Sequence, residues 1–168
     1  IEITKKTISA SGSRSYDGST DARGTDLTVF SGLVGSESLS LSGSGSVVLA
    51  SVGSNKSVNI ENLTLQDGTG AASNYNLNSA TLTINKRVVN ITASKVYDGT
   101  TNIQAVDIST ITDTVNSEVL TMSGGVGTTS SANVGVYDLV NTSQGTLALA
   151  NGPSGANQGL ASNYTLTG

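Results

Sequence analysis

The feature that most constrains this sequence is an internal repeat with a period of 81 residues. The motif Tyr-Asp-Gly followed by two hydroxyl residues occurs at residues 16–20 and again at 97–101. A second motif, Ser-Asn-Tyr, occurs later in each copy, at residues 73–75 and 162–164. A fixed spacing with landmarks in the same order is typical of tandem modules. The sequence therefore predicts one fold used twice.

The repeat divides the chain into two predicted domains, residues 1–84 and 85–168. The offset between equivalent residues grows from 81 at the first motif to 89 at the second, so the second copy is longer. Most of the extra residues fall in a Gly-, Asn- and Pro-containing stretch at 150–160. Loops absorb insertions at little thermodynamic cost, so this stretch predicts a longer surface loop.

The joint between the copies is predicted to be a continuous extended segment. Ile84 closes the first copy, yet it aligns with Ile3 near the start of a copy. No Gly- or Pro-rich stretch separates the copies, so we expect modules joined end to end in a stiff array. The sequence begins without methionine and stops in mid-pattern, which we interpret as a fragment of a longer protein.

Apolar and polar residues alternate along most of both copies, as they do in half-buried β-strands. Expected strands include residues 1–4, 26–30, 37–41, 47–50 and 136–140, with a Ser/Gly break at 42–45. No 11-residue window has a convincing helical period. We therefore predict an all-β fold of two tandem small Ig-like β-sandwiches. Modules resembling a β-grasp fold are the alternative, because strand order cannot be read from one sequence.

Composition excludes several functional classes. The chain has no cysteine and no histidine, which removes thiol chemistry, the usual general base and the commonest metal ligand. A net charge of −4 without a basic stripe argues against nucleic-acid binding. No apolar run approaches the length of a membrane span. With aromatics at 4% there is little material for a substrate cleft, so we expect neither an enzyme nor a cofactor.

The repeated motifs supply the candidate site residues. Their tyrosines could stack on a sugar while the aspartates accept its hydroxyls. Alternatively, the tyrosines anchor turns in a thin core and the aspartates cap backbone amides. Because each motif recurs once per module, we favour the structural interpretation. The candidates are Tyr16, Asp17, Gly18, Asn74, Tyr75, Tyr97, Asp98, Gly99, Asn163 and Tyr164.

The sequence also contains residues that bear on two further chemistries, calcium binding and an isopeptide crosslink. Acidic residues in the first copy could bind calcium, but no Asp-x-Asp-x-Asp-Gly loop is present, so we expect no metal. A lysine of a first strand could form an isopeptide crosslink with an asparagine of a last strand. The apolar aromatic surround that would shift a lysine's pKa is not evident, so surface charge is the favoured interpretation. The residues concerned are Asp17, Asp21, Asp26, Glu37, Lys5, Lys6 and Lys86.

A series of short motifs then recurs in the same order in both copies. In the first copy they are the acidic Glu37, Val-Gly at 52–53, Leu-Thr-Leu at 63–65, Ser-Asn-Tyr-Asn-Leu at 73–77 and Leu-Thr-Ile-Asn-Lys at 82–86. With the Tyr-Asp-Gly motif, this order resembles the YDG/MBG-type repeats of large bacterial surface adhesins of the filamentous-haemagglutinin kind. The resemblance covers nearly the whole chain. One departure is Ser36 or Ser117 before the acid, where glycine is usual.

The resemblance implies an extracellular protein of a Gram-negative bacterium. Its repeats would form a stalk that serves cell attachment or biofilm cohesion. The partners would be neighbouring repeats of the same chain, with host or biofilm glycans bound through other domains, and we expect a monomer. The resemblance implies no catalytic or cofactor residues. The alternative hypothesis is that the repeats themselves bind carbohydrate or exopolysaccharide, for which an exposed row of aromatic residues would be the discriminating feature.

Overall fold

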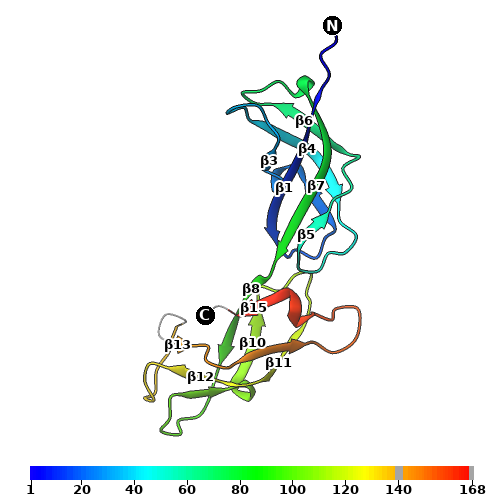
Figure 1. Ribbon diagram of the computed structural model, residues 1–168. Helices are drawn as coiled ribbons and strands as arrows, with labels where there is room; N and C mark the ends of the chain where they lie inside the picture. Colours follow the sequence, from blue (N-terminus) through cyan, green and yellow to red (C-terminus); the bar gives the residue numbers. More distant parts are fainter. Residues whose placement is uncertain (139–141, 167–168) are drawn as a thin grey trace. The chain divides into compact units, whose positions relative to one another are not determined.

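The computed structural model describes residues 1–138 and 142–166. The chain divides into two compact units, Ile1–Asn85 and Lys86–Gly168, called the first and second unit below (Figure 1). Both units consist of strands in several sheets, punctuated by short 3₁₀ turns. The predicted all-β fold with two sandwich-like repeats is confirmed. The division falls one residue after the boundary that the sequence suggested.

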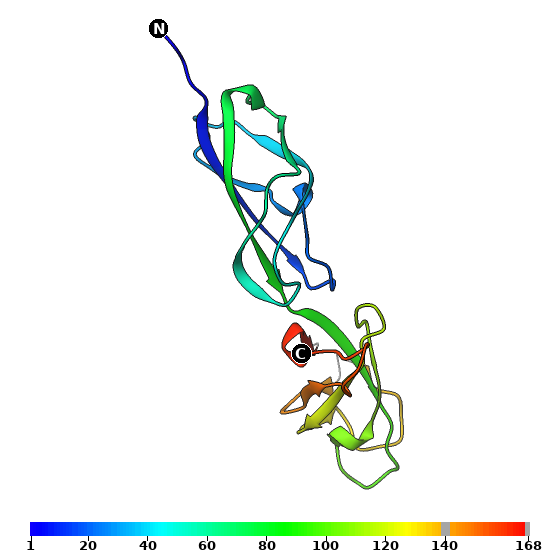
Figure 2. The ribbon, with the colours of Figure 1, turned by 90° about the vertical axis from the view of Figure 1, so that its right-hand side faces the viewer.

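The first unit contains two sheets. Its strands are β1 (Lys6–Ser15), β2 (Asp21–Arg23), β3 (Val29–Ser31), β4 (Leu39–Ser46), β5 (Gly53–Ser57), β6 (Leu63–Asp67) and β7 (Tyr75–Asn85). One sheet has the order β3-β1-β7-β5 and the other β2-β4-β6. The first and last strands, β1 and β7, are parallel and lie side by side along their length (Figure 2). The other pairs are antiparallel.

The pattern of buried residues along β7 explains how it contributes to the core. Tyr75 is buried, and after it Ala80, Leu82 and Ile84 are buried at alternate positions. Between these two stretches the register with β1 shifts, because Asn78 is an extra residue on β7. A bulge of one residue reverses which side chains face inward. Odd-numbered residues before the bulge and even-numbered residues after it therefore face the same core.

The predicted break at residues 42–45 is wrong, because β4 runs through it. β4 pairs with β6 over residues 39–43 and with β2 over residues 44–46. Gly43, at the change of partner, has φ +84°, and a Cβ there would lie 2.1 Å from the carbonyl oxygen of Asn62. Glycine therefore permits the close approach and the strand continues. The strand expected at 47–50 is not formed.

Two other predicted strands are corrected in the first unit. Residues 1–5 belong to no strand and are exposed. The stretch 26–30 is divided, because Asp26 ends the 3₁₀ turn η1 (Gly24–Asp26) and β3 begins at Val29. The Asp26 carboxylate accepts a hydrogen bond of 3.1 Å from the Arg23 amide. This side-chain contact favours a turn over an extended backbone.

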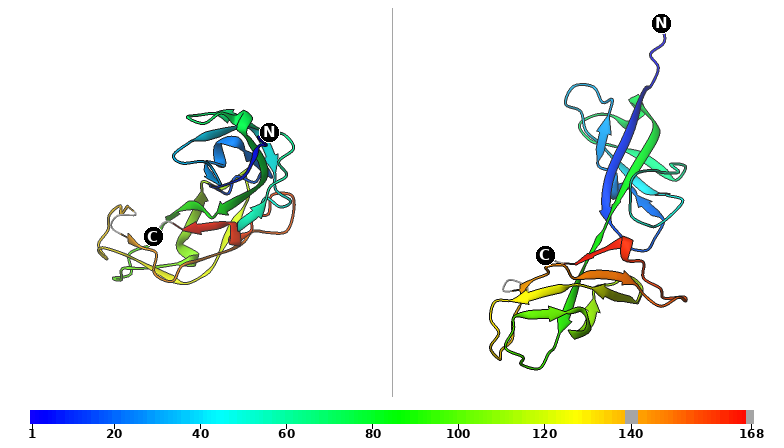
Figure 3. Two further views of the ribbon diagram at one scale, coloured as in Figure 1. Left: turned by 45° about the horizontal axis from the view of Figure 1, so that its top comes forward. Right: turned by 60° about the horizontal axis from the view of Figure 1, so that its bottom comes forward.

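The second unit contains three small sheets. Its strands are β8 (Arg87–Ala93), β9 (Asn102–Gln104), β10 (Ile108–Thr112), β11 (Leu120–Gly124), β12 (Val126–Thr129), β13 (Thr142–Ser143), β14 (Ala148–Asn151) and β15 (Tyr164–Leu166). The sheet orders are β10-β8-β15, β13-β12-β9 and β11-β14. β15 is parallel to β8, as β7 is to β1. Figure 3 shows β15 in red beside the green β8.

The two units differ where glycines interrupt a strand and where a loop is longer. β11 and β12 together occupy the place of β4, and the Gly124–Gly125 pair (φ +138° and +94°) separates them. Residues 136–138 form no strand, and the rest of the stretch expected at 136–140 lies outside the described residues. The long loop begins at residue 152 rather than 150, because β14 extends to Asn151.

Candidate functional site

The first Tyr-Asp-Gly motif forms a turn that is closed by its own side chains. Asp17 Oδ1 accepts a hydrogen bond of 2.9 Å from the Ser19 amide, which defines an Asx turn. Gly18 supplies the left-handed backbone that the turn requires, with φ +75°. The buried Arg14 side chain pairs with Asp17 and donates from Nη2 to the Ser19 carbonyl at 2.7 Å. The turn is therefore fixed by a basic residue that precedes it.

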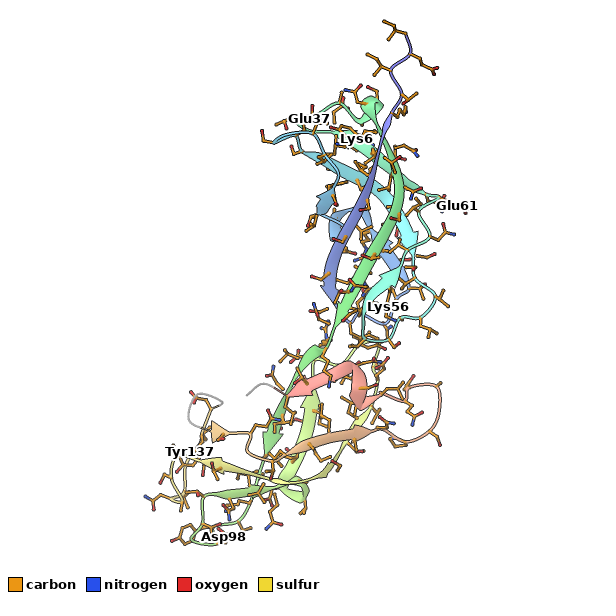
Figure 4. The ribbon with its side chains drawn as sticks, viewed as in Figure 1. Lys6, Glu37, Lys56, Glu61, Asp98 and Tyr137 are labelled. Carbon is orange, nitrogen blue, oxygen red and sulfur yellow. The ribbon has the colours of Figure 1, made fainter. Side chains whose placement is uncertain are left out.

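The second motif repeats this arrangement with lysine in place of arginine. Asp98 Oδ1 accepts from the Thr100 amide at 2.9 Å, and Gly99 has φ +78°. Lys95 Nζ lies 2.7 Å from Asp98 Oδ1 and also donates to the carbonyls of Thr100 and Asn102, at 2.9 and 2.8 Å. Figure 4 shows Asp98 in the loop that follows β8. The Lys95 ammonium and the Asp98 carboxylate thus bind each other and the backbone of this turn.

These contacts hold both carboxyl groups in the ionised form. Burial of Asp17 acts to raise the pKa of its carboxyl, but the Ser19 amide and the Arg14 charge together lower that pKa below 3.8. For Asp98 the hydrogen bond from Lys95 dominates, followed by those from Thr100, and the pKa is lowered to about 2. The aspartates are anchors for their turns rather than groups poised to exchange a proton near neutral pH.

The two motif tyrosines differ in burial. Tyr16 is 6% exposed, whereas Tyr97 is 63% exposed. The Tyr16 amide donates to the carbonyl of Asn85, the last residue of β7, at 2.9 Å. The chain therefore packs Tyr16 beneath the end of β7, while the equivalent Tyr97 faces solvent.

The Ser-Asn-Tyr tyrosines are buried in both units and bind an acid. Tyr75 donates to Glu37 and accepts from the Val34 amide at 3.1 Å; Figure 4 marks Glu37. Tyr164 donates to Glu118 Oε2 at 2.6 Å and accepts from the Val115 amide at 3.1 Å. The hydrogen bond to Glu37 is the main cause of a raised pKa of the Tyr75 hydroxyl. The same three-residue arrangement thus occurs twice, as Val34, Glu37 and Tyr75 in the first unit and as Val115, Glu118 and Tyr164 in the second.

The asparagines of this motif lie in the 3₁₀ turns η2 (Ala72–Asn74) and η5 (Ala161–Asn163), which lead into the last strands. Asn74 is exposed and Asn163 is buried. Each amide donates to a carbonyl three residues earlier. Sequence reasoning identified the tyrosines but did not pair them with Glu37 and Glu118. The signal that could have found the pair is the acid at the same place in both copies.

The segment before Glu118 has a left-handed backbone. Asn116 and Ser117 have φ of +48° and +61°. In the first unit Gly35, which aligns with Asn116, has φ +55°. Asparagine tolerates this conformation better than most residues, but serine at the second position costs about 1–2 kcal/mol relative to glycine. The departure from the usual glycine at residue 117 therefore carries backbone strain.

A groove of about 870 Å³ opens in the second unit. Its lining includes Tyr97 and Tyr137 with Lys95. Figure 4 labels Tyr137 and Asp98, which come from loops at the same end of this unit. The rest of the lining is mixed: it includes aliphatic residues such as Ile91, Ile103 and Leu147, and polar residues such as Thr92, Thr128 and Gln144.

Other candidate chemistries find no assembled site. Within residues 1–138 and 142–166, no three acidic residues are grouped so as to hold a metal ion. The acidic residues of the first copy have separate partners: Asp17 binds Arg14, Asp26 caps η1, and Glu37 binds Tyr75. Lys5, Lys6 and Lys86 are exposed. In the same described part of the chain, no helix has the length and apolar character needed to cross a membrane.

Fold and site define a tandem all-β repeat protein whose recurring polar motifs hydrogen-bond within their own unit. A family model for the YDG domain matches residues 2–84 and again residues 81–168. The chain therefore belongs to the YDG domain family, with two copies, and the predicted YDG-type repeat is confirmed. Neither the curated proteins nor the solved structures contain a match to the chain.

Proposed function

We propose that the two units are spacer repeats that carry tension within a bacterial surface adhesin. The observation that supports this most directly is the pairing of β1 with β7. The two strands are parallel over ten residue pairs, from Lys6–Tyr75 to Ser15–Asn85. Because they are also the first and last strands of the unit, the polypeptide enters at one end of this ladder and leaves at the other.

This geometry determines how a pulling force acts on the unit. Tension applied through the chain slides β1 and β7 past each other, so the hydrogen bonds of the ladder are loaded together. If both loaded ends lay at the same end of the ladder, the two strands would instead separate by breaking one hydrogen bond at a time. β8 and β15 have the same parallel pairing in the second unit. Resistance to shear is the property that a spacer under load requires.

The repeated motifs support the same proposal. In both units the acid, the basic residue and the buried tyrosine contact groups of their own unit. A residue that serves the fold of each repeat is needed once per repeat, which accounts for the recurrence. The resemblance to adhesin repeats supports a role for such spacers outside a Gram-negative bacterium, in attachment or biofilm cohesion. The ligand would then be bound by other domains.

Single-molecule force spectroscopy tests the proposal on a chain that has no native cysteine. Cysteine handles at Thr7 and Asn85 load the β1–β7 ladder in shear. Handles at Thr7 and Asn76, which pair directly, open the same ladder from one end. All three positions are exposed, so the handles disturb the core equally little. We expect a higher unfolding force in the shear arrangement, and equal forces would remove the support for a tension-bearing role.

Carbohydrate binding by the repeats is the second candidate, and exposed Tyr97 is the observation that favours it. Aromatic rings on an exposed surface are a common means of contacting sugars. A screen against a glycan array and extracted exopolysaccharide tests this, with Tyr97→Ala as the variant. Saturable binding that is lost in the variant, with circular dichroism unchanged, would assign the second Tyr-Asp-Gly turn to a ligand. Binding that survives in Tyr97→Ala would exclude that turn as the site.

A further inference from the structure

Four strands of the fully described first unit lie at the edges of its two sheets. They are β3 and β5 in one sheet, and β2 and β6 in the other (Figure 1). In the described part of the chain, no strand pairs with the outer edge of any of the four. An open edge exposes amide and carbonyl groups that can pair with another chain, and proteins usually prevent this with short strands, charged residues, prolines or bulges.

Three of these edges carry such protection. β2 and β3 contain only three residues each, and β2 exposes the charged Asp21 and Arg23. In β5 the register shifts between Gly53 and Lys56, and Asn55 between them has φ +49°. Short length, charge and irregular backbone each limit pairing with a further strand.

β6 has none of these features. It contains five residues, its register with β4 is continuous, and it has no lysine, arginine or proline. Its one charged residue is Asp67, the last of the strand, whose carboxylate accepts a hydrogen bond of 2.7 Å from the Ala72 amide. The equivalent strand of the second unit, β14, also lies at an edge and has no charged residue or proline. The unprotected edge thus occurs at the same place in both units.

The side chains of β6 complement those of a second β6 in an antiparallel pair centred on Leu65. Thr64 of one copy would lie opposite Gln66 of the other, and both are exposed on the outer face. A hydroxyl and a carboxamide directly opposite each other can form a hydrogen bond. Leu63 and Leu65 are half-buried on the inner face, so the two leucines at the centre extend the apolar side of the sheet.

Charge selects this register over its neighbours. A shift by one residue would exchange the two faces, so the alternatives are shifts by two. Either shift pairs only three of the five residues of each strand. The shift toward the start of the strand also places Asp67 opposite Glu61 of the second copy, and like charges directly opposite each other are destabilising. In the register centred on Leu65, Asp67 lies opposite Leu63, and no like charges meet within the strand.

We infer that β6 of one copy of this chain pairs antiparallel with β6 of a second copy, with Leu65 at the centre. Addition of a strand to an open sheet edge is a recurrent mode of association. The contact uses the same surface on both copies, so it is two-fold symmetric and closes as a dimer. It joins the two three-stranded sheets β2-β4-β6 into one continuous sheet.

The contact is small, so it is weak between free molecules. Five residues from each copy provide far less than the area of a standard stable interface. Association should therefore occur at high concentration, as between neighbouring molecules that are held side by side. This departs from the monomer expected from the sequence, and it adds a lateral contact to the tension-bearing role.

Disulfide trapping detects such a weak contact, because the chain has no native cysteine. A Thr64→Cys chain is mixed with a Gln66→Cys chain in a glutathione redox buffer. In the inferred register the two cysteines lie directly opposite, with Cβ atoms about 4.5–5.5 Å apart. In either variant alone they are diagonal neighbours about 7–8 Å apart, which exceeds the reach of a disulfide. The mixture should form disulfide-linked dimers at least about tenfold faster than either variant alone.

A matched control uses the other sheet. Val29→Cys and Ser31→Cys place cysteines at the same spacing on the edge strand β3, at positions that are also exposed. A mixture of these two variants should form disulfide-linked dimers no faster than either of them alone. The control separates pairing of β6 from random collision of exposed thiols.

Charged variants test the same register without a covalent bond. Thr64→Lys with Gln66→Lys sets lysine opposite lysine in a pair of like chains, and Thr64→Glu with Gln66→Glu sets glutamate opposite glutamate. In sedimentation velocity at up to about 1 mM, the wild type should associate, and each charged variant should have a dissociation constant at least about tenfold higher. An equal mixture of the two variants should associate again, because opposite charges then meet. Unchanged amide exchange in β4 would show that both variants are folded.

Three results would overturn the inference. The first is a wild-type chain that stays monomeric up to about 1 mM. The second is a Thr64→Cys or Gln66→Cys chain that crosslinks to itself as fast as the mixture, which would indicate another register. The third is association of the charged variants that equals that of the wild type, which would place the contact elsewhere. None of these depends on the force measurement, so the tension-bearing proposal stands or falls separately.

Discussion

Replacing Tyr164 with phenylalanine tests whether the Ser-Asn-Tyr motif stabilises the second unit through its hydroxyl. The Tyr164 side chain is 1% exposed. Its hydroxyl donates to Glu118 at 2.6 Å and accepts from the buried amide of Val115 at 3.1 Å. Phenylalanine keeps the ring and its packing, so the substitution removes these two contacts without creating a large cavity.

The magnitude follows from the two contacts. A hydrogen bond to a charged group is worth about 1.5–3 kcal/mol, and a buried amide that loses its acceptor costs about 1–3 kcal/mol. Allowing for water that reaches Glu118, we expect Tyr164→Phe to lower the free energy of unfolding of the second unit by about 2–4 kcal/mol. A domain of roughly 80 residues has about 4–12 kcal/mol in all. The loss is therefore a large share of the total.

Native-state hydrogen exchange is the suitable assay because it separates the two units. Amides of β8 report on the second unit, and amides of β1 serve as an internal reference. A loss of 2–4 kcal/mol corresponds to exchange that is about 30- to 900-fold faster in β8, with β1 unchanged. Tyr97→Phe is the matched control, because its hydroxyl is on an exposed side chain and its removal should change stability by less than about 0.5 kcal/mol.

A double-mutant cycle with Glu118→Gln isolates the pair. Groups in direct contact couple by about 0.5–3 kcal/mol, so the double variant should be less destabilised than the sum of the single variants. The reasoning is refuted if Tyr164→Phe leaves β8 exchange within about 0.5 kcal/mol of the wild type. Additive effects in the cycle would show that the carboxylate and the hydroxyl act independently.

Three further predictions concern the turns. The Asp98 carboxyl should titrate by NMR with a pKa of about 2 rather than 3.8, and Lys95→Met should raise that pKa. The stability that ionised Asp98 contributes is present above the pKa of the unfolded chain and is lost as the pH falls through the pKa of the folded one. A wild-type midpoint near 3.8 would contradict this prediction. Gly18→Ala should destabilise the first unit by about 1–2 kcal/mol, because Gly18 has a positive φ. Amide exchange in β1 measures this loss, and the control variant Gly53→Ala should have a smaller effect on it. Ser117→Gly should stabilise the second unit by up to about 1 kcal/mol by relieving left-handed strain, and β8 exchange no slower than in the wild type would count against it.

The fold class and the repeat could be predicted because both are local or periodic properties of the sequence. Alternation of apolar residues identified many of the strand-forming stretches, although residues 1–4 and 47–50 form no strand. The spacing of the motifs identified the two copies. The path of β4 could not be predicted, because Gly43 reads as a break. Whether a glycine ends a strand or lets it change partners depends on which backbone approaches it, here that of Asn62. That information is not local.

The candidate residues were found, but their environments were only partly predictable. Repeat logic gives equivalent residues equivalent surroundings, and it holds for Tyr75 and Tyr164. It fails for Tyr16 and Tyr97, because the strand that covers Tyr16 comes from the far end of the unit. Burial of a motif residue is therefore set by a neighbour about seventy positions away in sequence, and no pattern around the motif itself encodes it.

The loop insertion of the second unit shows that loop length and sheet pairing are independent in this fold. In both units the turn after the penultimate strand is tied to the same edge: Gly70 donates to Ser38 at 3.2 Å, and Gly159 to Val119 at 2.8 Å. A hydrogen bond from Gly68 to Gly70 closes this turn in the first unit, and one from Gly152 to Gly159 closes it in the second. The closed segment contains Thr69 alone in the first unit and residues 153–158 in the second. Lengthening such a loop costs only about 0.6 kcal/mol per doubling. We therefore expect an epitope, a protease site or a ligand-binding peptide inserted at Thr69 to be displayed without a change of strand register, at the loss of the hydrogen bonds between Thr69 and Ser38.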